Sequence, residues 1–423
     1  MTCKEALDYI SSTERFGSRP GLERITELLE KLGNPHKGMK FIHIAGTNGK
    51  GSCAAMLSSV MKAAGYKTGL FTSPYIFRFN ERMQINGRQI DDEALAQVVE
   101  KLKPAAEAME DHPTEFELMT AAALLWYRQE NCDIVVLEVG LGGRFDATNI
   151  IDAPEAAVIM NIGLDHTAVL GDSLEQIAFE KAGIIKENCP VVLYQQGSEV
   201  TDVIRRRCEE LDASLRIADF DDIKSEFDSL MGQSFKYNNE LYALPLLGSH
   251  QLKNAAVVLE TVDVLRSRGW KLEQSDVEHG LYAVSWPGRF ELLGDEEPEF
   301  IVDGGHNPQC AQSVKENLLH YFPGVYRVLL IGVLRDKDFA SLGEILDEAA
   351  CEYVCISPNN PRALPAAELA ASLEKYGKKI TVCDSIEEGV ETARDIAADK
   401  NGMVCAVGSL YSVGDIRACF GMY

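Results

Sequence analysis

The chain has 423 residues, more than a single hydrophobic core usually organises, so we expect two domains. Asp and Glu number 65 against 41 Lys and Arg, and the net charge of -24 argues against a nucleic-acid partner. No stretch offers the roughly 18 uninterrupted apolar residues of a membrane span, and the N-terminus lacks the pattern of a signal peptide.

Residues 1–40 predict two short helices around a turn at 16–21, because apolar residues recur at helical spacing. The apolar run Phe41–Ala45 then predicts a buried strand, and the alanine-rich stretch Cys53–Ala64 predicts a helix. Between them lies the glycine-rich sequence GTNGKGS, residues 46–52. Strand, glycine-rich turn and helix in this order are typical of a phosphate-binding loop.

The glycine-rich turn has the groups that a polyphosphate ligand requires. Glycines let backbone N–H groups approach phosphate oxygens, and the helix N-terminus adds partial positive charge. Lys50 can reach the terminal phosphates, while the hydroxyl of Ser52 can face a magnesium ion. The spacing is unusual, since only two residues separate Gly46 from Gly49 and Gly51 precedes the serine. A tight connection without a ligand is the alternative, and the flanking strand and helix favour nucleotide binding.

A second predicted strand, 66–72, delivers Ser73 to its carboxyl end, where loops face the ligand in open parallel sheets. The polar and aromatic stretch 75–91 is longer than a plain connection requires, so we interpret it as a substrate-facing loop. Two helices are then expected, at 92–109 and 118–128.

Candidate metal ligands follow three of the predicted strands. The buried strand 133–138 ends in the carboxylate of Glu138, and the buried strand 158–162 precedes His166. A nucleotide-bound magnesium ion needs hard oxygen ligands beside the phosphate loop. Ser73, Glu138 and His166 could therefore converge on one ion. An ordinary charge at the end of a strand is the alternative for Glu138.

The middle of the chain carries fewer chemical signals. His43 lies inside an apolar strand and is expected to be structural. A helix from Ser173 carries Lys181, and a lysine within a helix is normally a solvated charge. The alternating stretch 235–242 predicts a hairpin that extends the sheet. Residues 248–254 are expected to cap a long helix. A strand at 190–194 and a helix at 203–213 are also expected.

The acidic, proline-bearing stretch 294–298 is the best candidate for a domain linker. Beyond it, predicted strands and helices alternate regularly, which is the pattern of a doubly wound α/β sheet. Polar residues follow three of these strands: Asp303 with His306, residues 336–338, and Ser409 with Tyr411. The expected fold class is α/β, with an N-terminal phosphate-loop domain on a mostly parallel sheet and a smaller, Rossmann-like C-terminal domain.

Ordered motifs run through nearly the whole chain. They are GTNGKGS, TSPY with ERMQING, LEVGLGGRFDATN, NIGLDH, EKAGI, HQLKNA, WPGRFE, DGGHNP and GSLYSVGDIR. In this order they resemble the folylpolyglutamate synthase and dihydrofolate synthase family, within the Mur-ligase-like amide ligases. The resemblance implies an ATP-dependent ligase that adds L-glutamate to a folate, to dihydropteroate or to both, through an acyl phosphate. It also implies an ATP-binding domain with pterin-binding loops at 1–293, a linker at 294–299 and a glutamate-ligase domain at 300–423.

The resemblance further implies roles for residues that match the family's motifs. ATP contacts are expected from Asn48, Gly49, Lys50, Gly51, Ser52, Asn254, Arg289 and Asp303. Mg²⁺ is expected at Ser73, Glu138 and His166. Substrate contacts on the pterin side are expected from Pro20, Gly21, Leu22, the loop 75–87, Phe116, Glu117, Gly143, Arg144 and Phe145. His306 and Ser409 are expected at the glutamate end. Lys50, Lys181, His166 and Arg289 are the expected catalytic residues, and relatives often carry a carbamylated lysine at the position of Lys181.

Two other functions fit the sequence less well. Cell-wall ligases of the same superfamily usually carry an N-terminal domain for a nucleotide sugar, and only 45 residues precede this phosphate loop. A nucleotide-gated binding protein would not need Glu138, His166 and Lys181 together. Relatives often have a histidine where Tyr75 follows Pro74, which affects contacts inferred from that loop. The sequence leaves open whether the first glutamate, later ones or both are added.

Taken with the composition, the resemblance implies a cytoplasmic monomer that acts on small molecules, with no nucleic-acid or membrane partner. The 11 cysteines form no C-x-x-C pair and lie mostly in apolar stretches, which favours reduced, structural thiols.

Overall fold

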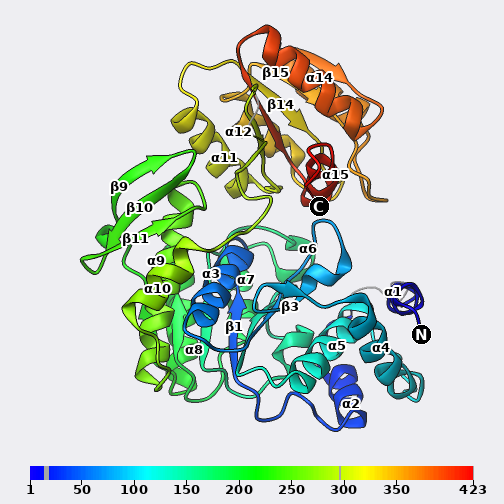
Figure 1. Ribbon diagram of the computed structural model, residues 1–423, viewed down its shortest axis with the longest axis vertical. Helices are drawn as coiled ribbons and strands as arrows, with labels where there is room; N and C mark the ends of the chain where they lie inside the picture. Colours follow the sequence, from blue (N-terminus) through cyan, green and yellow to red (C-terminus); the bar gives the residue numbers. More distant parts are fainter. Residues whose placement is uncertain (14–18, 295–296, 423) are drawn as a thin grey trace. The chain divides into compact units, whose positions relative to one another are not determined.

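The computed structural model describes residues 1–13, 19–294 and 297–422 (Figure 1). Contacts divide the chain into two compact units, each described here by itself. Unit 1 comprises Met1–Lys224, Phe235–Ala243 and Gln251–Val284, and unit 2 comprises Ser225–Ser234, Leu244–His250 and Ser285–Tyr423. The predicted turn at 16–21 and the predicted linker at 294–299 fall partly outside the described residues.

Unit 1 is built on an eight-stranded sheet with the order β4-β3-β2-β5-β1-β6-β7-β8. The strands are β1 (Phe41–Ala45), β2 (Thr68–Phe71), β3 (Met83–Ile85), β4 (Arg88–Gln89), β5 (Ile134–Glu138), β6 (Ala156–Ile159), β7 (Val191–Leu193) and β8 (Leu215–Ile217). Neighbours from β2 to β8 are parallel, and β3 and β4 add an antiparallel edge. Because β1 lies between β5 and β6, the turn that follows it is flanked by the carboxyl ends of both.

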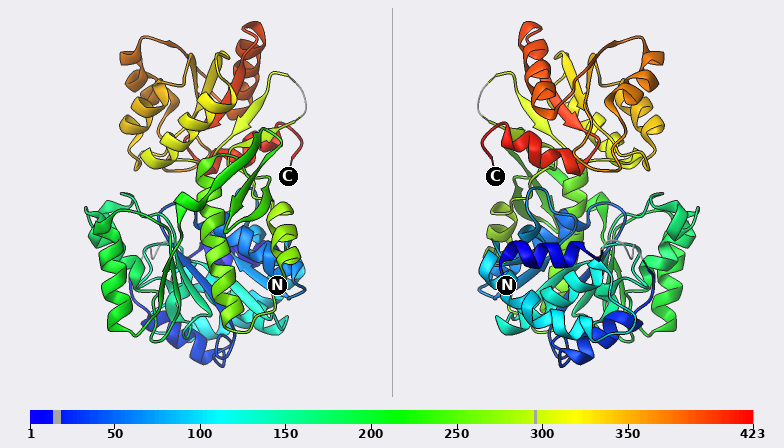
Figure 2. Two further views of the ribbon diagram at one scale, coloured as in Figure 1. Left: turned by 90° about the vertical axis from the view of Figure 1, so that its left-hand side faces the viewer. Right: turned by 90° about the vertical axis from the view of Figure 1, so that its right-hand side faces the viewer.

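Helices lie on both faces of this sheet (Figure 2). They are α1 (Cys3–Ser11), α2 (Glu23–Lys31), α3 (Lys50–Ala63), α4 (Asp92–Glu107), α5 (Glu115–Gln129), α6 (Thr167–Leu170), α7 (Leu174–Ala182), α8 (Ser198–Glu210), α9 (Ser249–Ser267) and α10 (Gln274–Tyr282). Phe41 joins a core with α2, α4 and α5, and Ala45 joins one with α7 and α8. Helix α3 contacts β1, β2 and β5 and packs against α10. All five residues of β1 are buried, as expected for a parallel strand covered on both faces.

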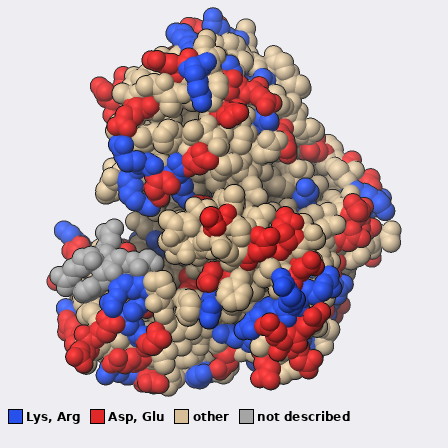
Figure 3. Space-filling model, turned by 180° about the vertical axis from the view of Figure 1, so that it is seen from behind, with Lys and Arg blue, Asp and Glu red and all other residues tan. Residues whose placement is uncertain are grey.

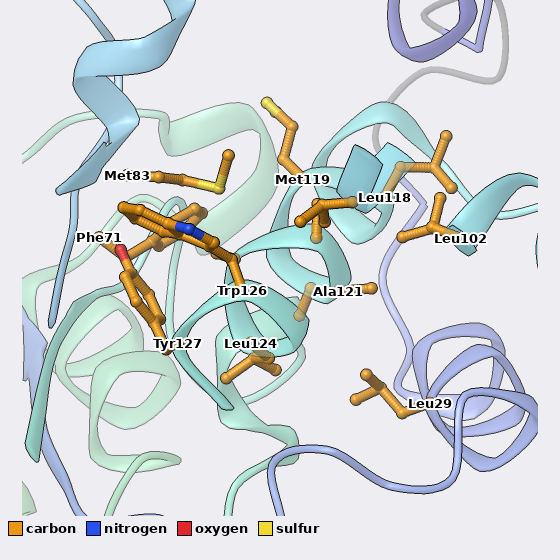
Figure 4. Close-up of a cluster of buried hydrophobic side chains, with 14 of the residues drawn as sticks. Leu29, Phe71, Met83, Leu102, Leu118, Met119, Ala121, Leu124, Trp126 and Tyr127 are labelled. Atoms are coloured by element: carbon orange, nitrogen blue, oxygen red, sulfur yellow. The ribbon is translucent and has the colours of Figure 1, made fainter. Parts of the chain in front are cut away.

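Helix α5 packs into the hydrophobic core that also contains Phe41 (Figure 4). Its Trp126 and Tyr127 lie beside Phe71 and Met83 of the sheet. The Tyr127 hydroxyl donates to the Leu70 carbonyl oxygen at 2.5 Å, which satisfies the one polar atom of a fully buried ring. The predicted helices at 92–109 and 118–128 are confirmed, and the second begins three residues earlier than expected.

Two predictions about the edges of the sheet of unit 1 were wrong. The stretch 75–91 is only partly a loop, because it contains β3 and β4. The hairpin at 235–242 does form, as β10 (Gly232–Tyr237) and β11 (Glu240–Leu244), with Asn238 and Asn239 both at positive φ. It does not extend the large sheet: it pairs with β9 (Lys224–Ser229) in a separate sheet of order β11-β10-β9, whose residues the two units share.

Unit 2 contains a six-stranded sheet with the order β12-β13-β17-β14-β15-β16, parallel except for β12. Its strands are β12 (Glu291–Leu293), β13 (Phe300–Val302), β14 (Arg327–Ile331), β15 (Glu352–Cys355), β16 (Lys379–Val382) and β17 (Met403–Val407). Its helices are α11 (Pro308–Tyr321), α12 (Phe339–Asp347), α13 (Ala366–Leu373), α14 (Ile386–Asp399) and α15 (Leu410–Ala418). Side chains of α11, α12 and α13 form one core with the sheet, and α14 contacts β14, β15 and β17. This is the predicted α/β class.

The division into units differs from the predicted domain bounds. Unit 2 already includes residues 285–293, because β12 pairs antiparallel with β13. The acidic stretch after Leu293 therefore joins two paired strands of one sheet. Of the helices in the described part of the chain, none has the length and apolar character needed to cross a bilayer. Figure 3 shows acidic and basic side chains interspersed on one face of the molecule.

Candidate active site

The glycine-rich turn joins β1 directly to α3 and needs glycine at two positions. A Cβ atom at Gly46 would lie 2.6 Å from the Cβ of Met160, and Gly49 caps α3 with φ of 84°. Helix geometry leaves the N–H groups of the first turn, Lys50–Ser52, without an acceptor inside the helix. The turn thus presents a helix N-terminus at the carboxyl edge of the sheet, an arrangement that suits phosphate oxygens.

The segment after β6 holds the start of this turn. The backbone N–H groups of Thr47 and Asn48 donate to the carbonyl oxygen of Asn161 at 2.7 and 3.2 Å. The Thr47 hydroxyl accepts from the N–H of Gly163 at 3.1 Å and lies 3.1 Å from the carbonyl oxygen of the same residue. The Asn48 N–H is therefore already bound within the protein. The backbone N–H groups that could donate to phosphate are expected from Gly49 onward.

Two lysines meet at one carbonyl oxygen. Lys50 Nζ lies 3.1 Å from the Gly46 oxygen, and Lys181 Nζ donates to the same oxygen at 2.9 Å. Lys181 is buried, so the expectation of a solvated helix charge was wrong. Burial, and then the charge of Lys50, lower the pKa of Lys181 to about 7. The side chain is buried because α7 ends against the glycine-rich turn rather than in solvent.

The candidate metal ligands follow three strands of one sheet, β2, β5 and β6, of which only β2 and β5 are neighbours. Ser73 comes after β2 and Glu138 ends β5, and the Ser73 N–H donates to the Glu138 carboxylate at 3.1 Å. His166 comes after β6 with φ of 51°, and its side chain lies 3.9 Å from the Asp165 carboxylate. The structure thus brings Ser73 and Glu138 together and places His166 at the tip of a strand on the other side of β1.

The donor set can be compared with what Mg²⁺ requires. In the residues that the structure describes, no three His, Cys, Asp or Glu side chains form a metal cluster. Mg²⁺ usually keeps several waters and takes one or two carboxylates together with phosphate oxygens of the substrate. The buried carboxylate of Glu138, next to a phosphate-binding turn, fits that pattern.

Asn254 approaches the turn from the first turns of α9. Its Oδ1 lies 2.7 Å from where a Cβ of Gly49 would stand, so the two are in close contact. Its amide nitrogen donates to Gln251 Oε1 at 3.0 Å, and Gln251 Nε2 donates to Ser52 Oγ at 3.3 Å. The predicted contact residues Gly49, Ser52 and Asn254 are therefore neighbours.

In unit 2, Arg289 and Asp303 lie together. The Asp303 carboxylate is buried and accepts from the N–H groups of Phe290 at 2.8 Å and Gly305 at 2.6 Å. Burial raises the pKa of Asp303, and the Arg289 charge opposes that shift. Phe290 has φ of 45°, so the carboxylate holds a strained turn beside the arginine. Asp303 therefore fixes the backbone that carries Arg289.

His306 and Ser409 lie on adjacent segments that leave the paired strands β13 and β17. The Gly408 N–H donates to the Gly305 carbonyl oxygen at 3.1 Å, which joins the two segments. His306 Nδ1 lies 3.0 Å from the Gly304 oxygen, and the Ser409 hydroxyl caps α15 by accepting from the Tyr411 N–H. The sequence-predicted polar edge of unit 2 is thus present.

The residues expected to contact the pterin at 20–22 and 116–117 differ in burial and in their contacts. Pro20 is exposed, while Gly21 and Leu22 are half-buried at the start of α2. The Phe116 ring lies where a Cβ of Gly140 would stand, at the tip of β5. Glu117 binds Arg24 at 3.0 Å and caps α5 through Thr114, so these contacts give it a structural position and do not support a substrate contact.

The segment Gly143–Phe145 lies against the end of α7. A Cβ at Gly143 would lie 2.8 Å from the Glu180 carbonyl oxygen, and Arg144 N–H donates to that oxygen. The Arg144 guanidinium lies 4.7 Å from the centre of the Phe145 ring and 5.4 Å from that of Phe179. Phe145 and Phe179 are about half exposed, at 45% and 52%. Exposed aromatic rings around a cation form a surface that a flat heteroaromatic group could contact.

Another exposed aromatic side chain, Tyr75, lies in the loop after Ser73. The Glu81 carboxylate accepts from the backbone N–H groups of residues 76–78 at 2.7 to 2.8 Å, which fixes the loop. Arg82 lies 4.9 Å from the centre of the half-exposed Tyr75 ring. The conformation of this loop is therefore fixed in part by its own Glu81 side chain.

Sequence reasoning missed three side chains at these sites. Gln251 was expected only as one of the residues 248–254 that cap α9, and Phe179 lies on the helix expected from Ser173 but was not itself predicted to have a role. Glu81 was expected only as part of the substrate-facing loop 75–87, and its role in fixing that loop was not predicted. Only a paired signal, such as the recurrence of polar residues at 251 and 254, could have pointed to Gln251.

Comparisons with known proteins agree over almost the whole chain. Residues 44–262 match the Mur ligase middle domain, and residues 288–410 match the Mur ligase, glutamate ligase domain. The dihydrofolate synthase/folylpolyglutamate synthase of Bacillus subtilis is 36% identical over 428 residues, covering 98% of each chain. The folylpolyglutamate synthase of Lacticaseibacillus casei is 34% identical over 431 residues, covering 99% of this chain and 98% of the relative. A structure of Mycobacterium tuberculosis folylpolyglutamate synthase complexed with ADP and AMPPCP superposes with a TM-score of 0.91, at 30% identity and 99% coverage of both chains.

Proposed function

We propose, because the chain belongs to the Mur ligase family and within it to the dihydrofolate synthase/folylpolyglutamate synthases, that it adds L-glutamate to a folate, to dihydropteroate or to both, with consumption of ATP. One observation carries this proposal. The chain aligns over 98% of its length with a relative named for both activities, and over nearly all of that relative.

The reaction begins with a carboxylate, which is a poor electrophile. One of its oxygens attacks the γ-phosphorus of ATP, ADP leaves, and the product is an acyl phosphate. The amino group of glutamate then attacks the acyl carbon, phosphate leaves, and an amide forms with loss of a proton from the amine. Phosphoryl transfer concentrates negative charge, so fixed cations and helix N–H groups lower its barrier.

The phosphate-binding turn supplies these groups in unit 1. The first-turn N–H groups of α3 and the Lys50 ammonium are proposed to hold the β- and γ-phosphates, with Gly49 and Gly51 allowing close approach. Lys181 is proposed to act beside Lys50. Its lowered pKa leaves a substantial fraction as the neutral amine near pH 7, and that is the form that reacts with carbon dioxide to give a carbamate.

Mg²⁺ is the proposed metal, held by Glu138, by the Ser73 hydroxyl and by His166 together with phosphate oxygens, and the Ser52 hydroxyl is proposed to face it. When bound, it neutralises charge on the phosphates and orients them. The support in the chain is the buried Glu138 carboxylate, to which the Ser73 backbone already donates.

The remaining contacts are proposed to come from both units. In unit 2, Arg289 is assigned to the transferring phosphate, held in place by Asp303, and Asp303 to the nucleotide, to which Asn254 of unit 1 is also assigned. His306 and Ser409 are assigned to the glutamate end. The pterin side is assigned to Pro20–Leu22, Phe116 and Gly143–Phe145. The exposed rings beside Arg144 support that last assignment.

The proposal extends to setting and partners. We place the enzyme in the cytoplasm, where its 11 free thiols would stay reduced, and expect it to act as a monomer on small molecules alone. Sedimentation at enzyme concentrations used in the assay measures the oligomeric state directly.

Phosphate release tests the function. The protein is incubated with ATP, Mg²⁺ and glutamate, with dihydropteroate or tetrahydrofolate as the acceptor. Release that requires glutamate and at least one acceptor supports the proposal, and the ratio of the two rates tells which acceptor is used. Release that ignores the pterin acceptor would reject it.

A further inference from the structure

Three buried polar side chains form a chain of hydrogen bonds beneath the phosphate-binding turn. Ser52 comes from the first turn of α3, and Gln251 and Asn254 come from the start of α9. Gln251 is 1% exposed, Ser52 3% and Asn254 4%. Gln251 lies in the middle, donating to Ser52 Oγ and accepting from Asn254 Nδ2. Since buried polar groups need partners, this geometry constrains all three side chains.

At its first end the Gln251 amide constrains the Ser52 hydroxyl. A hydroxyl has one proton and two lone pairs, and the amide N–H occupies one lone pair. The Ser52 proton cannot point toward the Gln251 N–H group. The directions of that proton and of the second lone pair of the hydroxyl oxygen are therefore limited. Ser52 stands where a phosphate loop directs a hydroxyl at the nucleotide-bound cation.

At its other end Gln251 sets the orientation of Asn254. The Asn254 amide nitrogen is held by Gln251 Oε1, so the carbonyl oxygen Oδ1 turns toward Gly49. The same glutamine thus determines which face Asn254 offers to the nucleotide and which lone pair Ser52 offers to the metal.

We propose that Gln251 is a positioning residue that couples the binding of Mg²⁺ to the binding of ATP. It acts through Ser52 and Asn254 and need not touch the substrate itself. The inference rests on the proposed nucleotide site, and it adds a residue and a coupling to that site. Coupling of this kind is reciprocal: Mg²⁺ tightens nucleotide binding by the same factor by which nucleotide tightens Mg²⁺ binding.

A plain structural role makes a different prediction. If Gln251 only joins α9 to α3, its loss lowers the melting temperature and leaves the effect of Mg²⁺ on nucleotide affinity unchanged. The test therefore measures the dissociation constant of the ATP analogue AMPPCP by calorimetry, with and without MgCl2, in the full-length protein. This readout needs no turnover, so it stands apart from the phosphate-release assay that tests the function.

Gln251→Met and Gln251→Asn are measured in parallel. The methionine keeps the length without donor or acceptor, and the asparagine keeps an amide that is too short to bridge both partners. Each is expected to reduce the Mg²⁺-dependent gain in AMPPCP affinity by about tenfold, which corresponds to the loss of one or two buried hydrogen bonds. Thr261→Val, which removes a buried hydrogen bond further along α9, is the matched control and is expected to keep the full gain.

A double variant decides whether Gln251 acts through the serine. Ser52→Ala alone is expected to lose most of the gain, and adding Gln251→Met to it is expected to change the gain less than twofold. The proposal would be overturned if the losses of Mg²⁺-dependent affinity in the two single variants multiplied in the double variant. It would also be overturned if either glutamine variant kept the full Mg²⁺-dependent gain in AMPPCP affinity. If Gln251→Met unfolds at the assay temperature, the asparagine variant gives the same decision.

Discussion

Lys50 and Lys181 donate to one carbonyl oxygen, that of Gly46, although they lie 131 positions apart in the sequence. Two ammonium groups at one acceptor repel each other, and burial adds to the cost of charge on Lys181. At the scale of single residues, the site therefore brings together two lysines, and Lys181 gives up its proton more readily than an ordinary lysine because it is buried beside the charge of Lys50.

Lys50→Ala should lower kcat by at least about 100-fold, the cost of losing one group that stabilises a transition state. The backbone of the turn and the start of α3 do not depend on this side chain, so the melting temperature should stay close to that of the unaltered protein. Steady-state kinetics and a thermal melt measure the two quantities. Undiminished turnover would remove Lys50 from the mechanism.

Lys181→Met should stabilise the fold, and more so at low pH. Below pH 7 the lysine is charged in the folded and the unfolded chain, so the cost of burying that charge is fully present. Between about 7 and its ordinary value of 10.5, the folded chain has lost a proton that the unfolded chain keeps, and the cost falls as pH rises. The gain in the free energy of unfolding should thus shrink between about pH 6 and pH 10.

Urea unfolding at several pH values, in buffer free of carbon dioxide, measures this gain. Lys186→Met, at a less completely buried lysine, is the control and should give a smaller dependence on pH. A stabilisation that does not change with pH would mean that Lys181 carries no buried charge.

The positions of many candidate site residues could be predicted from sequence, and the positions of the others could not for one reason. The phosphate loop, Glu138, and the polar tips of unit 2 follow strands, so the pattern of apolar runs locates them. Lys181 and Gln251 sit on helices, where polar residues are usually solvated or capping. Whether these side chains are buried depends on which other segment packs against them, and tertiary packing decides that.

At the scale of elements, α5 links the core of unit 1 to the edge of the predicted site. Its first turn carries Phe116, beside the tip of β5, and Glu117, which is bound to Arg24. The Arg24 and Glu117 side chains are 9% and 5% exposed, so the pair is buried. The start of this helix is fixed by that pair and by the capping bonds of Thr114.

Glu117→Ala should lower the free energy of unfolding by about 3 kcal/mol, because it leaves the buried Arg24 guanidinium without its buried carboxylate partner. KM for the folate should stay unchanged if the role is structural. Glu130→Ala, which breaks an exposed pair with Lys67, should cost less than about 1 kcal/mol. A higher KM without a loss of stability would instead support the substrate contact that the sequence predicted.

Elements with strong periodicity were predicted within a few residues, as α4, α5, β1 and β5 were. The shortest ones were not. β3 and β4 have three and two residues and show no alternation that could mark them. The separate three-stranded sheet was also missed, because pairing partners of a hairpin are decided by what lies beside it.

At the scale of the whole molecule, the predicted site residues fall in both units. The phosphate turn, Glu138, Lys181 and Asn254 belong to unit 1, and Arg289 and Asp303 belong to unit 2. If all of them act on one ATP, ligand binding must favour a single arrangement of the units. The α/β class was predictable because strands and helices alternate. The bounds of the units were not, because β12 pairs across the acidic stretch.

Binding of AMPPCP with Mg²⁺ should therefore narrow the distribution of distances measured by small-angle scattering. The Lys50→Ala variant should show a weaker change at the same ligand concentration, since it loses contacts to the terminal phosphates. Curves that superpose with and without ligand would contradict a single arrangement favoured by the ligand.

The proposed reaction requires that a carboxylate becomes an acyl phosphate before the amine attacks it. Turnover of a folate or dihydropteroate whose reacting carboxylate is labelled with ¹⁸O tests this directly, with mass spectrometry of the phosphate released. Each phosphate should carry one labelled oxygen, taken from the carboxylate when the acyl–oxygen bond breaks. Phosphate without label would show that ATP is cleaved by water and would contradict the mechanism.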